Sequence, residues 1–406
     1  MPSPYDLMRH LYTRCPLYQP NRTMSLRCHD LNLDDGFKII SEYLTPGLRR
    51  LHIGNSRYSW SSESWKIKSL LSHCASTLED LSIRFQIAYN EEPDELHHVL
   101  QLPASMPLLK CLALGELGNL PGSEMFLSWL WERCSQVEHL ELNALNDLPQ
   151  SLVDSLPIHM PKLNSIHLIK FGLSDAKIAE LLSKFHKGWK EVHMEDLYEQ
   201  SLQCTHRILM EHCLTLERLK ICSCKGFRGI WKAQLLAACP NLHTFISLED
   251  SGPFRSPSLD AHSFIDQDSR TGALKTWACE PSLKTLKVSI QFAPGRYLPN
   301  VLSPYPVQNP EMEGLVYDRL ARLTHLDILW LGQENHVYES LKMSLESGLH
   351  KLAGLKELRE LDTRRLLARI GVREVQWMVD QWPELHTVRF MERHTAETTE
   401  AKEWLQ

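Results

Sequence analysis

The sequence predicts an α/β solenoid of about twelve helix–strand repeats, with parallel strands on the concave face and helices on the convex face. One observation is a motif of three bulky apolar residues, spaced large-x-x-large-x-large, that recurs along the chain. Another is its rhythm, since five consecutive spacings are 26 to 28 residues. The third is a segment of helical periodicity before most copies. The first positions of the motif are Leu48, Leu78, Leu109, Val137, Leu163, Trp189, Leu216, Leu242, Leu283, Leu323, Leu358 and Leu385.

The strand of each repeat is predicted from the last two motif positions. They stand two residues apart, so both side chains point to one face of a strand and the residues between them point to the other. For the repeat that starts at Leu323, this places Leu326 and Ile328 in the core and His325 and Asp327 on the concave face.

The helix of each repeat is predicted from apolar residues at three- and four-residue steps, such as Ile178, Leu181, Leu182 and Phe185. One helix and one short strand cannot bury their apolar sides alone, whereas stacked copies can, so the unit reads as a leucine-rich repeat. The expected helices are 64–74, 124–134, 175–185, 206–213, 232–239 and 373–382.

Irregular segments set the expected domain organisation. Residues 46–392 form the repeat array, with loop insertions at about 249–275 and 291–315, the first rich in Ser, Asp, Gly and Pro. Within the second, the proline-rich 293–314 is either a solvated insertion or a polyproline-like segment for an aromatic groove. Residues 1–45 are expected to form an N-terminal cap or irregular first repeat. Residues 393–406 are expected to be an acidic capping helix or a frayed tail.

Composition narrows the classes of function. A net charge of −6 gives no general case for nucleic-acid binding. The first thirty residues contain no apolar core of a signal peptide, and no apolar run of 18 residues occurs, so no membrane association is expected. Eleven scattered cysteines in a chain without an export signal favour reduced thiols in the cytoplasm or nucleus.

No catalytic signature is found. The chain lacks a phosphate-binding glycine loop, a zinc-protease helix and a kinase motif, so we expect no enzyme activity and no cofactor. Cys222 and Cys224, with Cys213 and Cys204 upstream, are the best metal candidates by sequence, but they lack a clean second pair. We expect buried structural thiols there and no metal site.

The concave face is the predicted binding surface. Neighbouring strands lie about 4.8 Å apart, so side chains at equal offsets in consecutive repeats form ladders. Three interpretations remain open: a solvated inner face, a protein-binding patch, or a metal site made by His167, His193 and a carboxylate. The predicted partner-binding residues are His139, Glu141, His167, Glu191, His193, Arg218 and Lys220.

The positions of four cysteines resemble those of a known family. Cys74, Cys134, Cys213 and Cys239 stand three or four residues before the first motif position, as in the cysteine-containing leucine-rich repeats of F-box proteins. The C-terminal half resembles a fungal family of F-box-like repeat proteins. Its matching phrases are WACEPSLKTLKV (277–288), VYDRLARLTHLDILWLG (316–332), GLHKLAGLKELRELD (348–362) and GVREVQWMVDQWPELHTVRF (371–390).

The resemblance implies a substrate receptor of a cullin-RING ubiquitin ligase. In that family an F-box binds a Skp-type adaptor and the repeats hold the target. Residues 1–47 contain no Leu-Pro opening of an F-box. We therefore expect a non-catalytic scaffold that binds a protein on its concave face and is related to these receptors. The alternative is a stand-alone repeat adaptor with no ligase role or, as a minor alternative, an enzyme or metal-binding protein with its site on that face.

Overall fold

The structure is a computed structural model of the 406-residue chain. It divides into two compact units, residues 1–173 and 174–406, and each is described by itself. The residues that it describes are 22–27, 48–54, 61–63, 68, 71–72, 74–84, 86–88, 105–115, 123–144, 148–170, 172–186, 188–248, 259–292, 310–332, 341–366 and 370–390.

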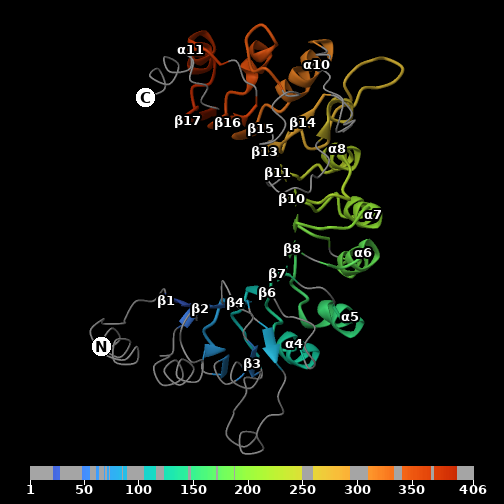
Figure 1. Cartoon of the computed structure of the whole chain (residues 1–406), viewed down its shortest axis with the longest axis vertical. Coiled ribbons are helices and arrows are strands. Elements are labelled where there is room, and N and C mark those ends of the chain that lie inside the picture. The colour runs from blue at the N-terminus through green and yellow to red at the C-terminus, as the bar shows by residue number, and fades with distance from the viewer. Residues whose placement is uncertain are drawn as a thin grey trace, which may run out of the picture. The chain divides into compact units, whose positions relative to one another are not determined.

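The first unit is built on a parallel sheet in the order β1-β2-β4-β6-β7-β8, so each strand pairs with the next along the chain (Figure 1). Between its later strands the chain forms helices on one face of the sheet. The strands are β1 (Arg22–Arg27), β2 (Leu48–Gly54), β4 (Asp80–Arg84), β6 (Cys111–Gly115), β7 (His139–Asn143) and β8 (Ser165–Ile169). The helices are α4 (Ser123–Trp131) and α5 (Gln150–His159), and β3 (Ser61–Glu63) pairs in parallel with β5 (Gln86–Ala88).

The second unit repeats the same plan in the order β9-β10-β11-β13-β15-β16-β17. Its strands are β9 (Glu191–Glu195), β10 (Arg218–Cys222), β11 (Thr244–Ser247), β13 (Thr285–Val288), β15 (Ile328–Gly332), β16 (Glu360–Arg365) and β17 (Thr387–Phe390). Its helices are α6 (Asp175–Ser183), α7 (Gln203–Glu211), α8 (Gly229–Ala238), α9 (Ala261–Ile265), α10 (Pro310–Ala321), the 3₁₀ helix η1 (Leu349–Gly354) and α11 (Val372–Gln381). The short strands β12 (Leu259–Asp260) and β14 (Ile290–Gln291) pair with each other.

Both units therefore have the predicted architecture, an α/β leucine-rich-repeat solenoid. The motif side chains fill the space between sheet and helices, as in β10, where Leu219 and Ile221 are buried. Among the predicted helices, those at 124–134, 175–185, 206–213, 232–239 and 373–382 are confirmed as α4, α6, α7, α8 and α11. None of the helices in the described ranges is long and apolar enough to cross a bilayer.

Two local devices recur from repeat to repeat. The residue after a strand takes a left-handed conformation, at Ala144, Lys170, Asp196 and Ser223. A Ser or Thr hydroxyl just before the first motif position bonds the carbonyl oxygen of that position in the preceding repeat, which satisfies a buried backbone acceptor. The oxygen–oxygen distances are 2.9 Å for Thr77–Leu48, 3.0 Å for Thr215–Trp189 and 3.0 Å for Ser282–Leu242.

One of these hydrogen bonds, from Thr215 to Trp189, requires a glycine at position 188. The φ of Gly188 is +84°, a region that favours glycine, and a Cβ there would collide with the side chain of Thr215. The glycine therefore lets Thr215 approach the turn that leads into Trp189.

The register of one repeat differs from the sequence prediction. Lys287 pairs with Trp330, and the N–H groups of Asp327 and Ile328 both bond the Lys284 carbonyl. In β10 the equivalent donors are Glu217 and Arg218. The motif positions of this repeat are thus Leu326, Leu329 and Leu331, all buried, and the prediction for its strand was wrong by three residues.

The predicted loop at 249–275 was also wrong in part, because it contains β12 and α9. Phe264 and Ile265 of α9 are buried. In the second predicted insertion, α10 begins at Pro310, while residues 293–309 lie outside the described residues. The predicted tail 393–406, and the N-terminal segment 1–45 apart from β1, lie outside them as well.

Candidate functional site

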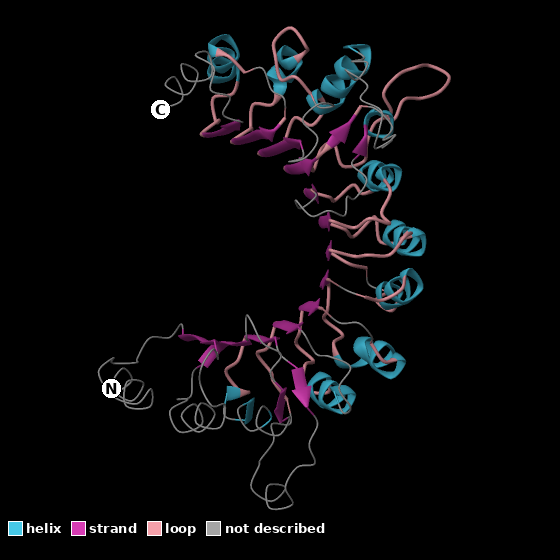
Figure 2. Cartoon of the chain, viewed as in Figure 1, coloured by secondary structure: helices cyan, strands magenta, loops and turns pink. Residues whose placement is uncertain are grey.

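The candidate site is the sheet face opposite the helices, which we call the open face. In each unit the strands lie on one side and the helices on the other (Figure 2). Side chains alternate along each strand, so Leu219 is buried against the helices while Arg218 and Lys220 reach solvent on the open face. All seven predicted binding residues stand on strands at open-face positions.

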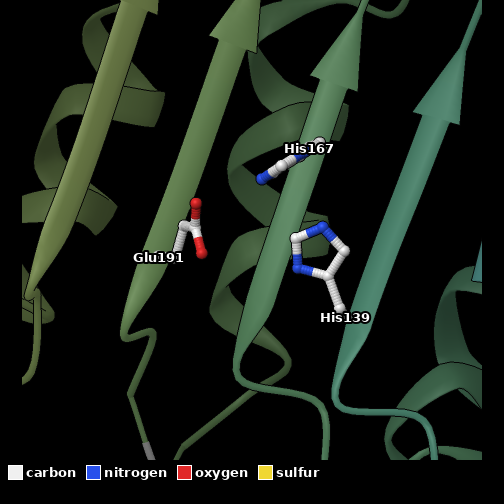
Figure 3. Close-up of side chains that lie close together, drawn as sticks. All are labelled: His139, His167 and Glu191. Atoms are coloured by element: carbon white, nitrogen blue, oxygen red, sulfur yellow. The ribbon is translucent and has the colours of Figure 1, made fainter. Parts of the chain in front are cut away.

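His139, Glu141 and His167 lie together on the open face of the first unit. The rings of His139 and His167, on β7 and β8, meet edge to face with centroids 4.2 Å apart (Figure 3). Glu141 is the register partner of His167 and accepts a hydrogen bond of 2.8 Å from the Arg84 guanidinium. Arg84 is on β4, so its side chain reaches past the intervening β6.

The reach of Arg84 depends on Gly115 in β6. A Cβ at Gly115 would lie 3.2 Å from the Arg84 Cγ, closer than most side-chain contacts. Gly115 therefore leaves the room through which Arg84 reaches Glu141 on β7. The sequence prediction included Glu141 but missed Arg84. Arg84 is the seventh residue of its repeat, counted from Leu78, and only the third and fifth residues were predicted to face a partner.

Glu191, His193, Arg218 and Lys220 lie together on β9 and β10 of the second unit. Glu191, also labelled in Figure 3, accepts a hydrogen bond of 2.7 Å from the Arg218 guanidinium. This bond is the main cause that raises the pKa of Arg218. His193 and Lys220 are register partners, and both contact Glu195.

Glu195 is the residue of this group that sequence reasoning missed. One carboxylate oxygen lies 2.7 Å from His193 Nε2 and 2.8 Å from Lys220 Nζ. These contacts lower its pKa to about 2, with the His193 bond the largest cause and burial opposing it. The signal was present, since Glu195 stands two residues after His193 and so shares its face of the strand.

The interpretation as a metal site would need His167 and His193 as ligands, and these two residues belong to different units. His167 belongs to the first unit and contacts the His139 ring, whereas His193 belongs to the second and lies against Glu195. The structure thus gives each histidine a neighbour of its own within its unit.

A second group, centred on Trp330, lies on β13, β15, β16 and β17. Lys287 Nζ stands 3.2 Å from the centroid of the Trp330 ring, and the indole N–H donates to Glu360 over 3.1 Å. Arg389 approaches Glu360 at 3.3 Å and Asp362 at 3.9 Å. Burial is the main cause that lowers the pKa of Lys287. We call these five residues the Trp330 cluster.

Trp330 was missed because of the register error in β15. The predicted register placed His325 and Asp327 on this face, where the structure has Ile328 and Trp330. His325 instead lies before the strand, within 3.1 Å of Glu357.

The predicted burial is confirmed for Cys222 and Cys224. The Cys224 thiol donates to the Cys222 carbonyl, and burial raises the pKa of Cys224 to about 12. Burial also raises the pKa of Cys222. Such thiols are poor nucleophiles near neutral pH because they stay protonated. Cys213 is only half-buried.

Comparisons with known proteins add little. No protein-family model and no curated protein sequence matches the chain. Among solved structures, it is similar to the Rad7–Elc1 complex of yeast, with 11% identity, a TM-score of 0.39 and coverage of 88% of this chain and 82% of that one. It is also similar to an internalin of Listeria monocytogenes, with 12% identity, a TM-score of 0.39 and coverage of 96% and 95%. At these TM-scores neither similarity carries an argument about function.

Proposed function

We propose that the chain is a non-catalytic scaffold that binds a partner protein on its open face. The observation that carries the proposal is the composition of that face in the second unit. The sheet face against the helices carries leucines, whereas the open face carries ion pairs and Trp330. The side chains of these ion pairs and of Trp330 are only partly buried. Partly exposed Trp and Arg side chains, held by neighbours, are the residue types that carry binding energy at protein interfaces.

A relation to the substrate receptors of Skp-cullin-F-box ligases is the narrower part of the proposal. It is supported by the sequence phrases shared with F-box-like repeat proteins and by the repeat cysteines Cys74, Cys134 and Cys239, which are buried at the ends of their helical segments. The second candidate is a stand-alone repeat adaptor. We propose a cytoplasmic or nuclear location for either, supported by the buried thiols of Cys134, Cys224 and Cys239.

A charge swap tests the scaffold proposal. The double variant Glu191→Arg/Arg218→Glu keeps an ion pair between β9 and β10 but reverses the charges offered to a partner. We expect proteins captured by the tagged full chain to be lost, while the thermal midpoint moves by no more than about 2 °C. The measurement is affinity capture from cell extract with quantitative mass spectrometry.

The matched control is Arg207→Glu on α7, an exposed residue on the helix side. It repeats the Arg→Glu half of the swap on the helix side and should leave capture unchanged. Retention of every captured protein by the swapped variant would contradict binding at β9 and β10. A Skp-type adaptor among the captured proteins supports the ligase relation, and its absence favours the stand-alone adaptor.

A further inference from the structure

The Arg and Lys ion pairs of the open face share one order: the basic side chain lies outside and the acidic one lies underneath. In the second unit the pairs link neighbouring strands, so the long Arg and Lys side chains cover the carboxylates from above. In the second unit the exposed fractions, base then acid, are 47% and 21% for Arg218–Glu191, 36% and 23% for Lys220–Glu195, and 42% and 19% for Arg389–Glu360.

The first unit has the same order in its own pair, with Arg84 at 50% and Glu141 at 17%. Two ion pairs on the helices have the opposite order. Lys184–Glu180 on α6 has 31% for the base and 38% for the acid. At the end of α4, Arg133 is 17% exposed and Glu132 is 53% exposed. On the open face, an approaching molecule therefore meets the Arg and Lys side chains of these pairs first.

Apolar surface lies between these basic groups. Across β10, β11, β13 and β15 the register runs Lys220, Ile246, Lys287, Trp330. Ile328 stands two residues before Trp330 on the same face, and all three apolar side chains are partly exposed. The open face of the second unit thus offers an apolar stripe bordered by cations.

We propose that this stripe binds an acidic segment of a partner protein. A large apolar or aromatic side chain of the segment packs against Ile246, Ile328 and Trp330, and its carboxylates meet Lys220, Lys287 and Arg389. The inference rests on the proposed scaffold function and adds the chemistry of the partner. Charge complementarity carries it, because exposed cations select an acidic partner even on a chain with a net charge of −6.

A polyanion such as a nucleic acid fits this face less well. Ile246 stands between Lys220 and Lys287 in the register, so these cations do not form the continuous basic track that a phosphate backbone follows. Spaced carboxylates with an apolar residue between them match the stripe better.

Selection from a random library tests the proposal without a known ligand. A phage library of random 12-residue peptides is selected on the immobilised full chain at low salt. We expect the enriched peptides to be rich in Asp and Glu and to contain a Trp, Phe, Tyr or Leu. The tightest peptide, measured by fluorescence anisotropy, should bind about tenfold more weakly when NaCl rises from 50 to 500 mM.

Two variants place the peptide on the stripe. Lys287→Met removes the charge but keeps an aliphatic chain over the Trp330 ring, and Trp330→Ala removes the ring. Each should weaken the tightest peptide about tenfold. Arg207→Met on α7 is the matched control and should leave its Kd within about twofold. Circular dichroism melts show that the variants are folded.

The outcomes separate the two proposals. Neutral or basic peptides that bind the wild type and lose affinity in Trp330→Ala would overturn the acidic partner but support a binding open face. Peptides unaffected by either variant would overturn both. Failure to enrich any peptide would overturn the acidic-segment inference, as would equally tight binding of a 12-nucleotide oligo-dT.

Discussion

Glu195 shows how single residues shape the open face. Its carboxylate accepts hydrogen bonds from His193 on its own strand and from Lys220 on the next. Both bonds favour the ionised form, which is why its pKa falls to about 2 despite partial burial. The residue therefore fixes the orientation of two side chains that were predicted to meet a partner.

The pKa of Glu195 leads to a pH-dependent contribution to stability. Because the folded pKa lies below the ordinary value of 4.5, the stabilisation is present above about pH 4.5 and is lost as pH falls toward 2. Glu195→Gln should lower the free energy of unfolding by about 1 kcal/mol at pH 7, a figure reduced for solvent screening, and by less at pH 3. Urea unfolding at both pH values measures the difference.

The control for this prediction is Glu384→Gln, an exposed residue in the turn before β17. Its effect should stay within about 0.3 kcal/mol at both pH values. A Glu195→Gln effect of equal size at pH 7 and pH 3 would show that the ionised carboxylate is not what stabilises this site.

Trp330 shows the limit of sequence reasoning at single residues. The stretch LTHLDILWL fits the motif twice, from Leu323 and from Leu326. Periodicity alone cannot choose between two registers that both place leucines in the core. The pairing of Lys287 with Trp330 decides it, and that contact is between repeats.

At the scale of elements, Arg319 of α10 explains why the predicted loop is ordered. Its guanidinium is fully buried and donates to the carbonyl oxygens of Ile265 and Lys275 at 2.5 and 2.6 Å. It also pairs with Glu280 at 2.8 Å and lies 4.4 Å from the Trp277 ring centroid. One side chain thus joins α9 and the segment after it to α10.

Removing Arg319 should destabilise this region strongly. Arg319→Met leaves the Glu280 carboxylate and two carbonyl oxygens without their main donor, so we expect a loss of about 3–5 kcal/mol in the free energy of unfolding. Arg322→Met, at an exposed position of the same helix end, should cost less than about 1 kcal/mol. Urea denaturation followed by circular dichroism measures both, and similar small losses would contradict the role given to Arg319.

Elements were predicted well where their signal is local. Helix and strand periods placed α4, α6, α7, α8 and α11 because each buries one apolar stripe. The short α9 was missed because its stretch is rich in Ser, Asp and Gly. Its stabilising donor comes from Arg319, 54 residues from Ile265 in sequence, which no local pattern reveals.

At the scale of the whole molecule, the repeat period builds the candidate site. Glu191 and Arg218 are 27 residues apart, one repeat, and become neighbours because each strand pairs with the next. The sequence therefore predicted which side chains of β9 and β10 lie side by side on the open face, but not those of β15. It could not predict that the bases cover the acids, because that depends on side-chain conformation.

The central claim is that a partner binds on the open face. Site-specific photo-cross-linking tests it most directly. A benzophenone amino acid replaces either Ile246 on the open face of β11 or Gln234, exposed on α8. After irradiation with captured proteins, we predict covalent adducts from position 246 and none from position 234. Adducts from position 234 alone would contradict the claim.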